Sequence, residues 1–329
     1  MAATTSTATT LEQAAAHLAA LLLAPAGGLR DATDSDLKFE EIVEPRPLAA
    51  QPPPHEVWAV DGGQALVADA RCVQVYVTRA GRARFADGRC TLEDEGELRA
   101  FVVGGSAARE AALASLGVEG IDPKSSVDVN LVRDRWEWEG AARCVAEAEP
   151  GALVLIDGDL EADWRLPAVV VRGVLDGAAE RDVLVAAVTK HSSLSRGGAP
   201  LLSQLELQAE ASFGPRARWW APVAHSRTGR GVQVVAARLD PDARFAFRID
   251  LAAAVDPAQA LGRIAAVADD AAFPGYPYAL AVADRLAACP GWLRAEAWLQ
   301  LDDLLGRAGV APAVRERAFT DRHRLLERS

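Results

Sequence analysis

The segment Ala152–Ile156 is a continuous apolar run, and it ends at the polar residue Asp157. A short run of this kind is typical of a strand buried on both faces, because a strand with one wet face alternates apolar and polar residues. The flanking segments 131–148 and 168–180 have helical spacing, and Val183–Val188 is again strand-like. Alternating strands and helices predict a mixed sheet flanked by helices, so we expect an α/β protein.

Apolar, β-branched runs earlier in the chain predict adjacent antiparallel strands. These runs are Val57–Val60, Ala65–Ala70 and Val73–Thr78, and Asp61-Gly62-Gly63 separates the first two. Asp-Gly is a common hairpin turn, so one interpretation is that Asp61 begins a turn. The other is that Asp61 closes a strand and projects its carboxylate from an edge of the sheet.

The other segments complete the expected organisation. Residues 1–54 form an N-terminal helix and a Pro-rich linker, residues 55–290 the main domain, and residues 291–329 a helical tail. The N-terminal helix reaches about Leu23 and opens with a capping box, Thr10 with Gln13 or Thr9 with Glu12. Within the domain we also expect a helix over 97–116, a hairpin of 232–238 with 244–249, and helices after Pro257 and Pro277. The tail is expected to pack on the domain, the alternative being a surface for a partner.

Composition removes several classes of protein. A formal net charge of −11 argues against a generic nucleic-acid binder, whose usual footprint is strongly positive, although a nuclease can concentrate positive charge locally or use metal ions. The four cysteines form no CxxC pair, which argues against a zinc knuckle. No apolar run reaches the roughly 18 uncharged residues of a membrane span, and no basic segment of a signal peptide precedes the first helix. We expect a soluble, cytoplasmic protein that does not contact membranes.

Common catalytic motifs are absent, which leaves carboxylates as the candidates. The sequence contains no GxxxxGK[ST], HExxH or GxSxG motif, and the neighbours His191 and Ser192 do not make a triad, whose members meet only in space. Asp61 and Asp157 each close an apolar run. If both project into one crevice, their oxygens can bind Mg²⁺ or Mn²⁺. The alternative for each is a simple turn.

Five other residues have two interpretations each. Glu137 and Glu139 lie two apart on a helix and cannot share a face, so one at most points at such a crevice and both can be solvated. Asp284 is either a ligand or the wet face of its helix, paired with an arginine. The Trp219-Trp220 pair lies between arginines and either stacks on unpaired bases or belongs to the core or a dimer interface.

Four motifs together resemble the NurA nuclease family over Val57–Ala288. In chain order they are Val60-Asp61-Gly62-Gly63, Leu155-Ile156-Asp157-Gly158-Asp159-Leu160, Thr189-Lys190, and Tyr276-Pro277-Tyr278-Ala279-Leu280 with Ala283-Asp284. The resemblance implies an RNase H-like core and a DNA nuclease that uses Mn²⁺, with Mg²⁺ possible and two ions in the site. It also implies 5′-to-3′ exonuclease and single-strand endonuclease activity, a homodimer, and a hexameric HerA-type ATPase partner in DNA end resection and double-strand break repair.

The resemblance also assigns roles to particular residues. Asp61 and Asp157 match metal ligands, and Asp284 falls where many relatives carry a histidine ligand. Glu137 is the choice for an intermediate glutamate ligand, because it shares a helical face with Arg133 and Ala141, and Glu139 is the reserve. Tyr276 matches a tyrosine near the site. Lys190, with Arg196, would contact the scissile phosphate; the alternative for Lys190 is a solvated loop lysine.

Two other functions remain open on the sequence. One is a non-catalytic adaptor of the same fold that docks on a HerA-type motor, for which converging carboxylates would have no use. The other is an RNase H-like enzyme that acts on RNA or on hybrids. A substrate panel distinguishes the second from a DNA nuclease.

Overall fold

The computed structural model describes residues 10–320 except 24–27, 31–36, 118–120, 123, 125, 161–162 and 228–230. The elements up to the middle of the chain are α1 (Leu11–Leu23), β1 (Leu29–Arg30), β2 (Leu37–Phe39), β3 (Arg46–Pro47), β4 (Glu56–Asp69), β5 (Gln74–Ala86), β6 (Arg89–Asp94), β7 (Arg99–Val103), α2 (Ser106–Leu116), α3 (Val129–Glu147) and β8 (Leu153–Asp157). They are followed by α4 (Ala168–Glu180), β9 (Leu184–Thr189), β10 (Ser195–Arg196), β11 (Ala199–Pro200), α5 (Leu201–Phe213), β12 (Trp219–Ser226), β13 (Val232–Arg238), β14 (Phe247–Ala252), α6 (Pro257–Ala265), α7 (Tyr278–Ala287), α8 (Gly291–Arg307) and α9 (Pro312–Phe319).

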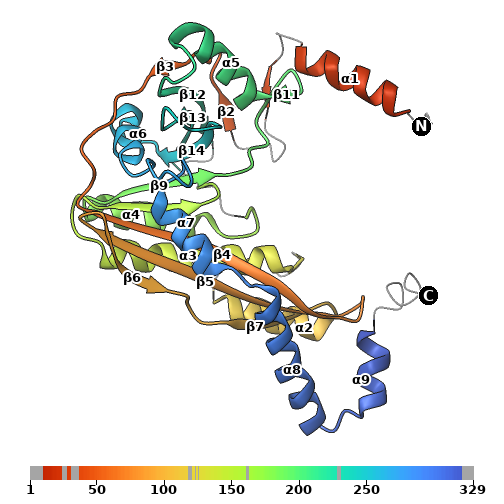
Figure 1. The fold of residues 1–329 in the computed structure, drawn as a ribbon. Helices are drawn as coiled ribbons and strands as arrows, with labels where there is room; N and C mark the ends of the chain where they lie inside the picture. The colour runs from red at the N-terminus through yellow and green to blue at the C-terminus, as the bar shows by residue number, and fades with distance from the viewer. Residues whose placement is uncertain are drawn as a thin grey trace.

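Within the described residues, one eleven-stranded sheet runs through the molecule, and a small sheet of β1, β10 and β11 lies beside it. Five neighbours in the large sheet have the order β6-β5-β4-β8-β9. Strand β5 is antiparallel to both of its neighbours, β6 and β4, and β8 and β9 run parallel to β4. This is the strand order of an RNase H-like core, so the predicted fold class is confirmed. Antiparallel strands β14, β13 and β12 extend the sheet beyond β9, as Figure 1 shows.

The central strands are buried on both faces, as the apolar run predicted. Val154 and Ile156 of β8 pack into the core formed with α3 and α4. Leu153 and Leu155 pack into the core formed with α6 and α7. Successive side chains of a strand point to opposite faces, and each fully buried aliphatic side chain contributes roughly 1.5–3 kcal/mol. The two helical layers are therefore fastened to the same short strand.

Strand β4 continues through Asp61-Gly62-Gly63, so the predicted break and hairpin turn there are wrong. Asp61 pairs with Gly81, and Gly63 with Arg79, across the β4–β5 ladder. The glycines serve close packing instead. A Cβ atom at Gly62 would lie 2.9 Å from the Glu137 side chain of α3, and one at Gly63 would lie 1.8 Å from the Ala287 carbonyl oxygen of α7.

Three other expectations change in detail. Segment 97–116 divides at Gly104 into strand β7 and helix α2, rather than forming one helix. The expected linker contributes β3, which pairs with β12 at one edge of the sheet. Helix α5 was not predicted; its buried face packs against β12 and β13 in a third core cluster. Helices α3, α4, α6 and α7 and the β13–β14 hairpin form where the pattern predicted them.

The two ends of the chain pack least. Thr10 and Gln13 form the reciprocal hydrogen bonds of the predicted capping box, at 2.9 and 3.2 Å, while Thr9 lies outside the described residues. Helices α8 and α9 contain no buried residue and contact each other through Trp298 and Phe319. Both also have residues close to β4, and the packing of the tail on the domain stays a prediction. Figure 1 shows both helices projecting beyond the sheet. In the described part of the chain, no helix has the length and apolarity needed to cross a membrane.

Gly63→Ala is expected to destabilise the protein by about 3 kcal/mol, the upper end of ordinary overpacking, because the new methyl group meets backbone atoms of α7 that have no room to move. The matched control is Gly173→Ala in α4, where a Cβ atom would meet nothing within 4 Å. Alanine favours a helix over glycine, so the control should be neutral or stabilised by up to about 1 kcal/mol. Urea unfolding measures both, and equal effects of the two substitutions would contradict the close approach.

Candidate functional site

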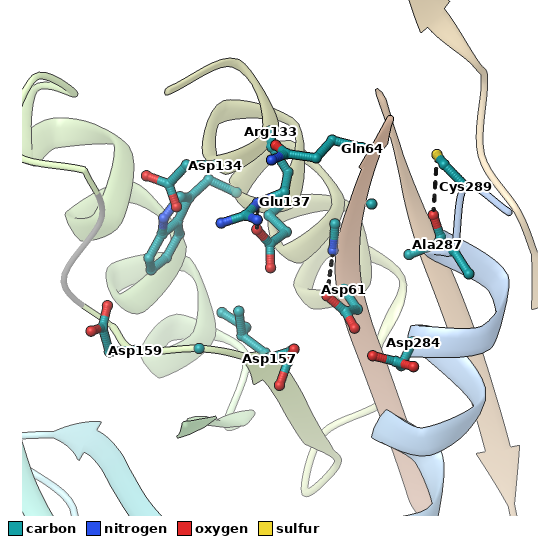
Figure 2. Close-up of a pocket in the computed structure, with 16 residues that line it drawn as sticks. Asp61, Gln64, Arg133, Asp134, Glu137, Asp157, Asp159, Asp284, Ala287 and Cys289 are labelled. Carbon is teal, nitrogen blue, oxygen red and sulfur yellow. Dashed lines mark hydrogen bonds and ion pairs between the residues drawn. The ribbon is translucent and has the colours of Figure 1, made fainter. Parts of the chain in front are cut away.

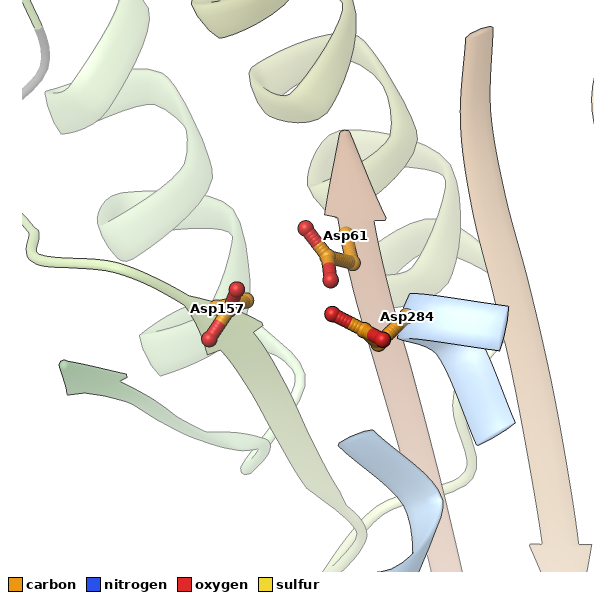
Figure 3. Close-up of side chains that lie close together, drawn as sticks. All are labelled: Asp61, Asp157 and Asp284. Carbon is orange, nitrogen blue, oxygen red and sulfur yellow. The ribbon is translucent and has the colours of Figure 1, made fainter. Parts of the chain in front are cut away.

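Three aspartates from different elements meet at one place on the sheet. Asp61 lies within β4, Asp157 ends β8, and Asp284 lies on α7. One carboxylate oxygen from each lies within 4.8 Å of the others, and in the described part of the chain no other group of three potential metal ligands is found. Figure 3 shows the three side chains pointing toward one another.

Strand register brings the first two carboxylates together. Val60 of β4 pairs with Ile156 of the parallel neighbour β8, so the next residue in each strand, Asp61 and Asp157, lies at the same level of the sheet. Helix α7 crosses β4 and β5 closely at the glycines and carries Asp284 to the same level. Asp61 is buried, Asp157 is half-buried and Asp284 is exposed, so the cluster opens to solvent on the side of α7.

The cluster lies in an acidic cavity of about 490 Å³. Its lining holds six acidic side chains: Asp61, Asp134, Glu137, Asp157, Asp159 and Asp284. Figure 2 shows Asp134 and Glu137 entering from α3, on the other side of Asp61 from Asp284. Such a collection of oxygen ligands is the donor set that hard divalent cations bind.

Lys190 compensates part of this negative charge. Its Nζ atom lies 2.5 Å from Asp284 Oδ1, 3.0 Å from Asp157 Oδ2 and 3.7 Å from Asp61 Oδ2. Lys190 follows β9, the neighbour of β8, which explains its position. The solvated-loop alternative for Lys190 is therefore excluded. Tyr276 completes the group, since its hydroxyl donates a hydrogen bond to Asp157 Oδ1 at 3.1 Å.

Burial and the neighbouring charges shift the pKa values of these side chains. Burial, and next the Asp157 carboxylate, raise the pKa of Asp61 to about 8, although Lys190 opposes the shift. Burial lowers the pKa of Lys190, but the hydrogen bond to Asp284 and the charges of Asp157 and Asp61 outweigh it and raise that pKa overall. The hydrogen bond from Lys190 lowers the pKa of Asp284. Without a bound cation, Asp61 therefore holds a proton at neutral pH.

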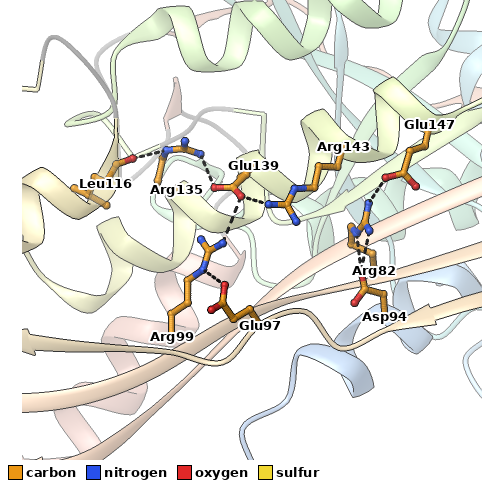
Figure 4. A network of polar contacts seen from close by, with 9 residues as sticks. All are labelled: Arg82, Asp94, Glu97, Arg99, Leu116, Arg135, Glu139, Arg143 and Glu147. Carbon is orange, nitrogen blue, oxygen red and sulfur yellow. Dashed lines mark hydrogen bonds and ion pairs between the residues drawn. The ribbon is translucent and has the colours of Figure 1, made fainter.

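The structure distinguishes between the two glutamates on α3. Glu137 is buried in the cavity wall beside Arg133 at 3.7 Å, and burial followed by the charge of Asp61 raises its pKa well above the usual value. Glu139 points away, into a network with Arg99, Arg135 and Arg143 that Figure 4 shows. Glu137 is thus the one with access to the aspartates, as the helical-face argument predicted.

Sequence reasoning missed two acidic residues of the cavity, Asp134 and Asp159. Asp134 lies one turn before Glu137, a spacing that places both on one helical face, and burial raises its pKa to about 6. It accepts a hydrogen bond from the Asp163 amide at 2.5 Å. Asp159 lies 3.7 Å from Arg248. The i, i+3 spacing was the available indication for Asp134.

A buried ion pair supports the loop that follows Asp157. Arg248 and Asp250 of β14 are 2% and 0% exposed and form two hydrogen bonds, at 2.9 and 3.0 Å. Asp250 also accepts a hydrogen bond from the Leu160 amide at 3.1 Å. The loop is thereby tied to strand β14 of the large sheet.

Three predicted DNA contacts do not lie in this cavity. Trp219 and Trp220 are 1% and 8% exposed and belong to core clusters, so the core alternative holds and a base-stacking role is wrong for them. Their strand, β12, is covered on both faces. Arg196 lies in the small sheet and donates a hydrogen bond to the Val43 carbonyl at 3.3 Å. It is absent from the cavity lining, so the structure does not bring it to the aspartates.

Comparison with protein-family models and with curated protein sequences finds no match. Solved structures do match. The NurA nuclease from Sulfolobus solfataricus superposes with a TM-score of 0.53 at 17% identity, over 82% of this chain and 88% of that one. A second NurA structure gives 0.43 at 8% identity, over 72% and 86%, and the catalytic domain of human Endonuclease V gives 0.40 at 13%, over 78% and 85%. The chain therefore has the fold of the Sulfolobus NurA nuclease.

Asp61→Asn is expected to raise the melting temperature in EDTA by a few degrees at pH 9, and to change it little at pH 4. Because the folded pKa of about 8 exceeds the usual 3.8, the folded state holds the extra proton between these values. The free energy of unfolding of the wild type therefore falls as the pH rises from about 4 to about 8, because Asp61 is harder to deprotonate in the folded than in the unfolded state. Asparagine does not ionise, so the variant does not lose this stability. Calorimetry across this range measures it, with the exposed Asp176→Asn as control. A gain that does not depend on pH would contradict the raised pKa.

Proposed function

We propose that this chain is a divalent-metal-dependent DNA nuclease. The observation that carries the proposal is the convergence of Asp61, Asp157 and Asp284 from two parallel strands and a crossing helix. This convergence lies at the aspartate positions that the motif resemblance singled out, on a fold that the Sulfolobus NurA nuclease shares. Carboxylates held this close are unfavourable without a cation, so their arrangement supports a role in binding one.

The donor set suits Mn²⁺ or Mg²⁺, which prefer carboxylate oxygens. Asp61, Asp157 and Asp284 would hold the first ion, and Glu137, which lines the same cavity, would be a further ligand for a second. Bound there, divalent ions would stabilise the attacking and leaving oxygens of a phosphodiester. Asp61 has to lose its proton before it can act as a ligand, so activity should rise with pH through the neutral range.

Other residues of the site would orient the ligands and the substrate. The Tyr276 hydroxyl holds one oxygen of Asp157, and burial followed by the Asp157 charge raises the tyrosine pKa, so the group stays a donor. Lys190 lies beside all three aspartates and is half-exposed, which lets its ammonium group turn to a phosphate oxygen once cations occupy the carboxylates. Preorganised positive charge of this kind stabilises a transition state that gains negative charge.

The finer properties extend this proposal by family resemblance. They are Mn²⁺ as the preferred ion, two ions in the site, 5′-to-3′ exonuclease and single-strand endonuclease activity, and action as a homodimer in the cytoplasm. They also include work with a hexameric HerA-type ATPase in DNA end resection and double-strand break repair. We also propose residues 55–290 as the nuclease domain. The exposed helices α8 and α9 lie outside it and are free to contact a partner.

Asp61→Asn and Asp157→Asn are each expected to reduce DNA cleavage by about 100-fold or more, the size of effect produced by removing one group that stabilises a transition state. The measurement uses 5′- and 3′-labelled single- and double-stranded DNA, RNA and hybrids, with Mn²⁺, Mg²⁺ or chelator. Asp284→Asn should also reduce cleavage, and Asp176→Asn on the exposed face of α4 is the control. Circular dichroism of each variant confirms folding.

Each outcome of this panel separates the candidate functions. Cleavage of DNA that requires metal and is lost in both aspartate variants supports the nuclease. Cleavage restricted to RNA or hybrids would replace DNA as the substrate. No cleavage by the wild type, alone or with a HerA-type ATPase, together with no metal binding by calorimetry, would favour the non-catalytic adaptor.

Lys190→Met is expected to separate metal binding from catalysis. Removing the ammonium group leaves the three carboxylates without their cation, so Mn²⁺ should bind more tightly at pH 8.5, by about 10-fold. Cleavage should nevertheless become about 100-fold slower, because the phosphate loses a positive partner. Calorimetry and single-turnover kinetics measure the two effects. Weaker Mn²⁺ binding would show that Lys190 organises the carboxylates rather than replacing a cation among them.

A further inference from the structure

A second cavity, of about 610 Å³, adjoins the aspartate cluster. Asp284 lines both cavities, and Lys190 and Tyr276, which contact the aspartates, line the second. Three phenylalanines contribute to the remaining wall: Phe245 and Phe247 come from the β13–β14 connection and the start of β14, and Phe273 from the loop before α7. The second cavity therefore begins where the proposed reaction site ends.

Two of its aromatic rings are exposed, although they are large and apolar. Phe245 is 59% exposed and Phe273 is 56% exposed, whereas Tyr276 is only 8% exposed. The buried Tyr276 packs against Phe247 with 5.6 Å between ring centroids, which makes a firm floor. Two exposed phenylalanines from separate loops at one cavity are unlike the isolated apolar residues that any surface carries. Their rings are available to a ligand with a flat face.

Positive charge accompanies the rings. The Arg244 guanidinium lies over the Phe245 ring at 5.5 Å, and the Lys190 ammonium lies over the Tyr276 ring at 5.5 Å. The acidic residues of this wall are already paired, Asp242 with Arg216 and Asp284 with Lys190. Aromatic faces alternating with cations, next to a site that acts on a phosphate, match a nucleotide: the rings suit its base and the cations suit its backbone.

We propose that this second cavity is a base-stacking subsite that takes an unpaired nucleobase of the DNA strand beside the scissile phosphate, between Phe245 and Phe273. A base inside a duplex is stacked on its neighbours and cannot enter a cavity of this kind, so the subsite favours single-stranded or frayed substrate. The inference rests on the proposed nuclease function and specifies the form of DNA on which it acts. It also gives the base-stacking role, which was one of the two interpretations of Trp219 and Trp220, to other aromatic residues.

The test begins with binding of fluorescein-labelled oligo(dT) to the full chain, with Ca²⁺ in place of Mn²⁺ to slow cleavage. Phe245→Ala and Phe273→Ala should each weaken binding by about 5- to 150-fold, the range for loss of one stacked base. Phe245→Trp should restore binding, because the larger ring also stacks. Phe213→Ala at the end of α5 is the matched control, since Phe213 is an exposed phenylalanine outside the cavity.

A second measurement identifies the base as the contact. An abasic site is moved stepwise along a labelled strand, and cleavage in Mn²⁺ is timed. In the wild type, an abasic site at one position relative to the cut should slow cleavage. In Phe245→Ala, an abasic site at that position should not slow cleavage any further. Weaker binding that leaves the abasic penalty unchanged would overturn the base-stacking subsite, because the rings would then contact something other than a base.

The failure of this inference can be told apart from failure of the nuclease proposal. If the wild type cleaves DNA and both alanine variants bind and cleave like Phe213→Ala, the nuclease stands and the subsite is overturned. If the wild type cleaves nothing, yet binds oligo(dT) in a way that both alanine variants weaken and Phe245→Trp restores, the subsite stands and the catalytic proposal fails.

Discussion

Mutual repulsion among three carboxylates is the constraint around which this molecule is organised. At an effective dielectric constant of about 20, two unit charges 4 Å apart interact by about 4 kcal/mol, so Asp61, Asp157 and Asp284 stay together only because the fold holds them. Strands β4 and β8 are packed into both core clusters, and helix α7 is packed into one of them. Lys190 offsets part of this repulsion, and burial, followed by the charge of Asp157, raises the pKa of Asp61. A site built this way is prepared for a cation.

The same packing that stabilises the fold places the ligands. Helix α7 packs closely against β4 and β5 at glycines, which have no side chain. This close packing determines how far Asp284 lies from the sheet. On the other face, Gly62 admits Glu137 from α3. Residues 62 and 63 point to opposite faces of one strand, so two neighbouring glycines bring two helices to the flanks of one aspartate. Stability and site geometry therefore depend on the same contacts.

The function that we propose requires a chain with a net charge of −11 to bind a polyanion. The acidic cavity alone would repel DNA, so cations bound by the aspartates, together with Lys190, are needed to reverse the local field. The adjoining aromatic cavity offers an attraction that does not depend on charge, with Arg244 at its edge. In the proposed function, bound metal, Lys190 and the aromatic rings would together bind one strand, and an acidic protein could then act on DNA.

The sequence by itself determined the layered α/β fold, because apolar runs buried on both faces have few other solutions, and it singled out Asp61 and Asp157 at the ends of such runs. Helical periodicity indicated that at most one of Glu137 and Glu139 faces the site, and the resemblance to the NurA family favoured Glu137. Only the tertiary structure decided that Asp61 lies within a continuous strand, since glycines in a turn and glycines under a helix look alike in sequence. Only the tertiary structure likewise shows that Trp219 and Trp220 are buried and that Phe245 and Phe273 are exposed. Exposure depends on which distant elements cover a residue, and the local sequence pattern does not contain this information.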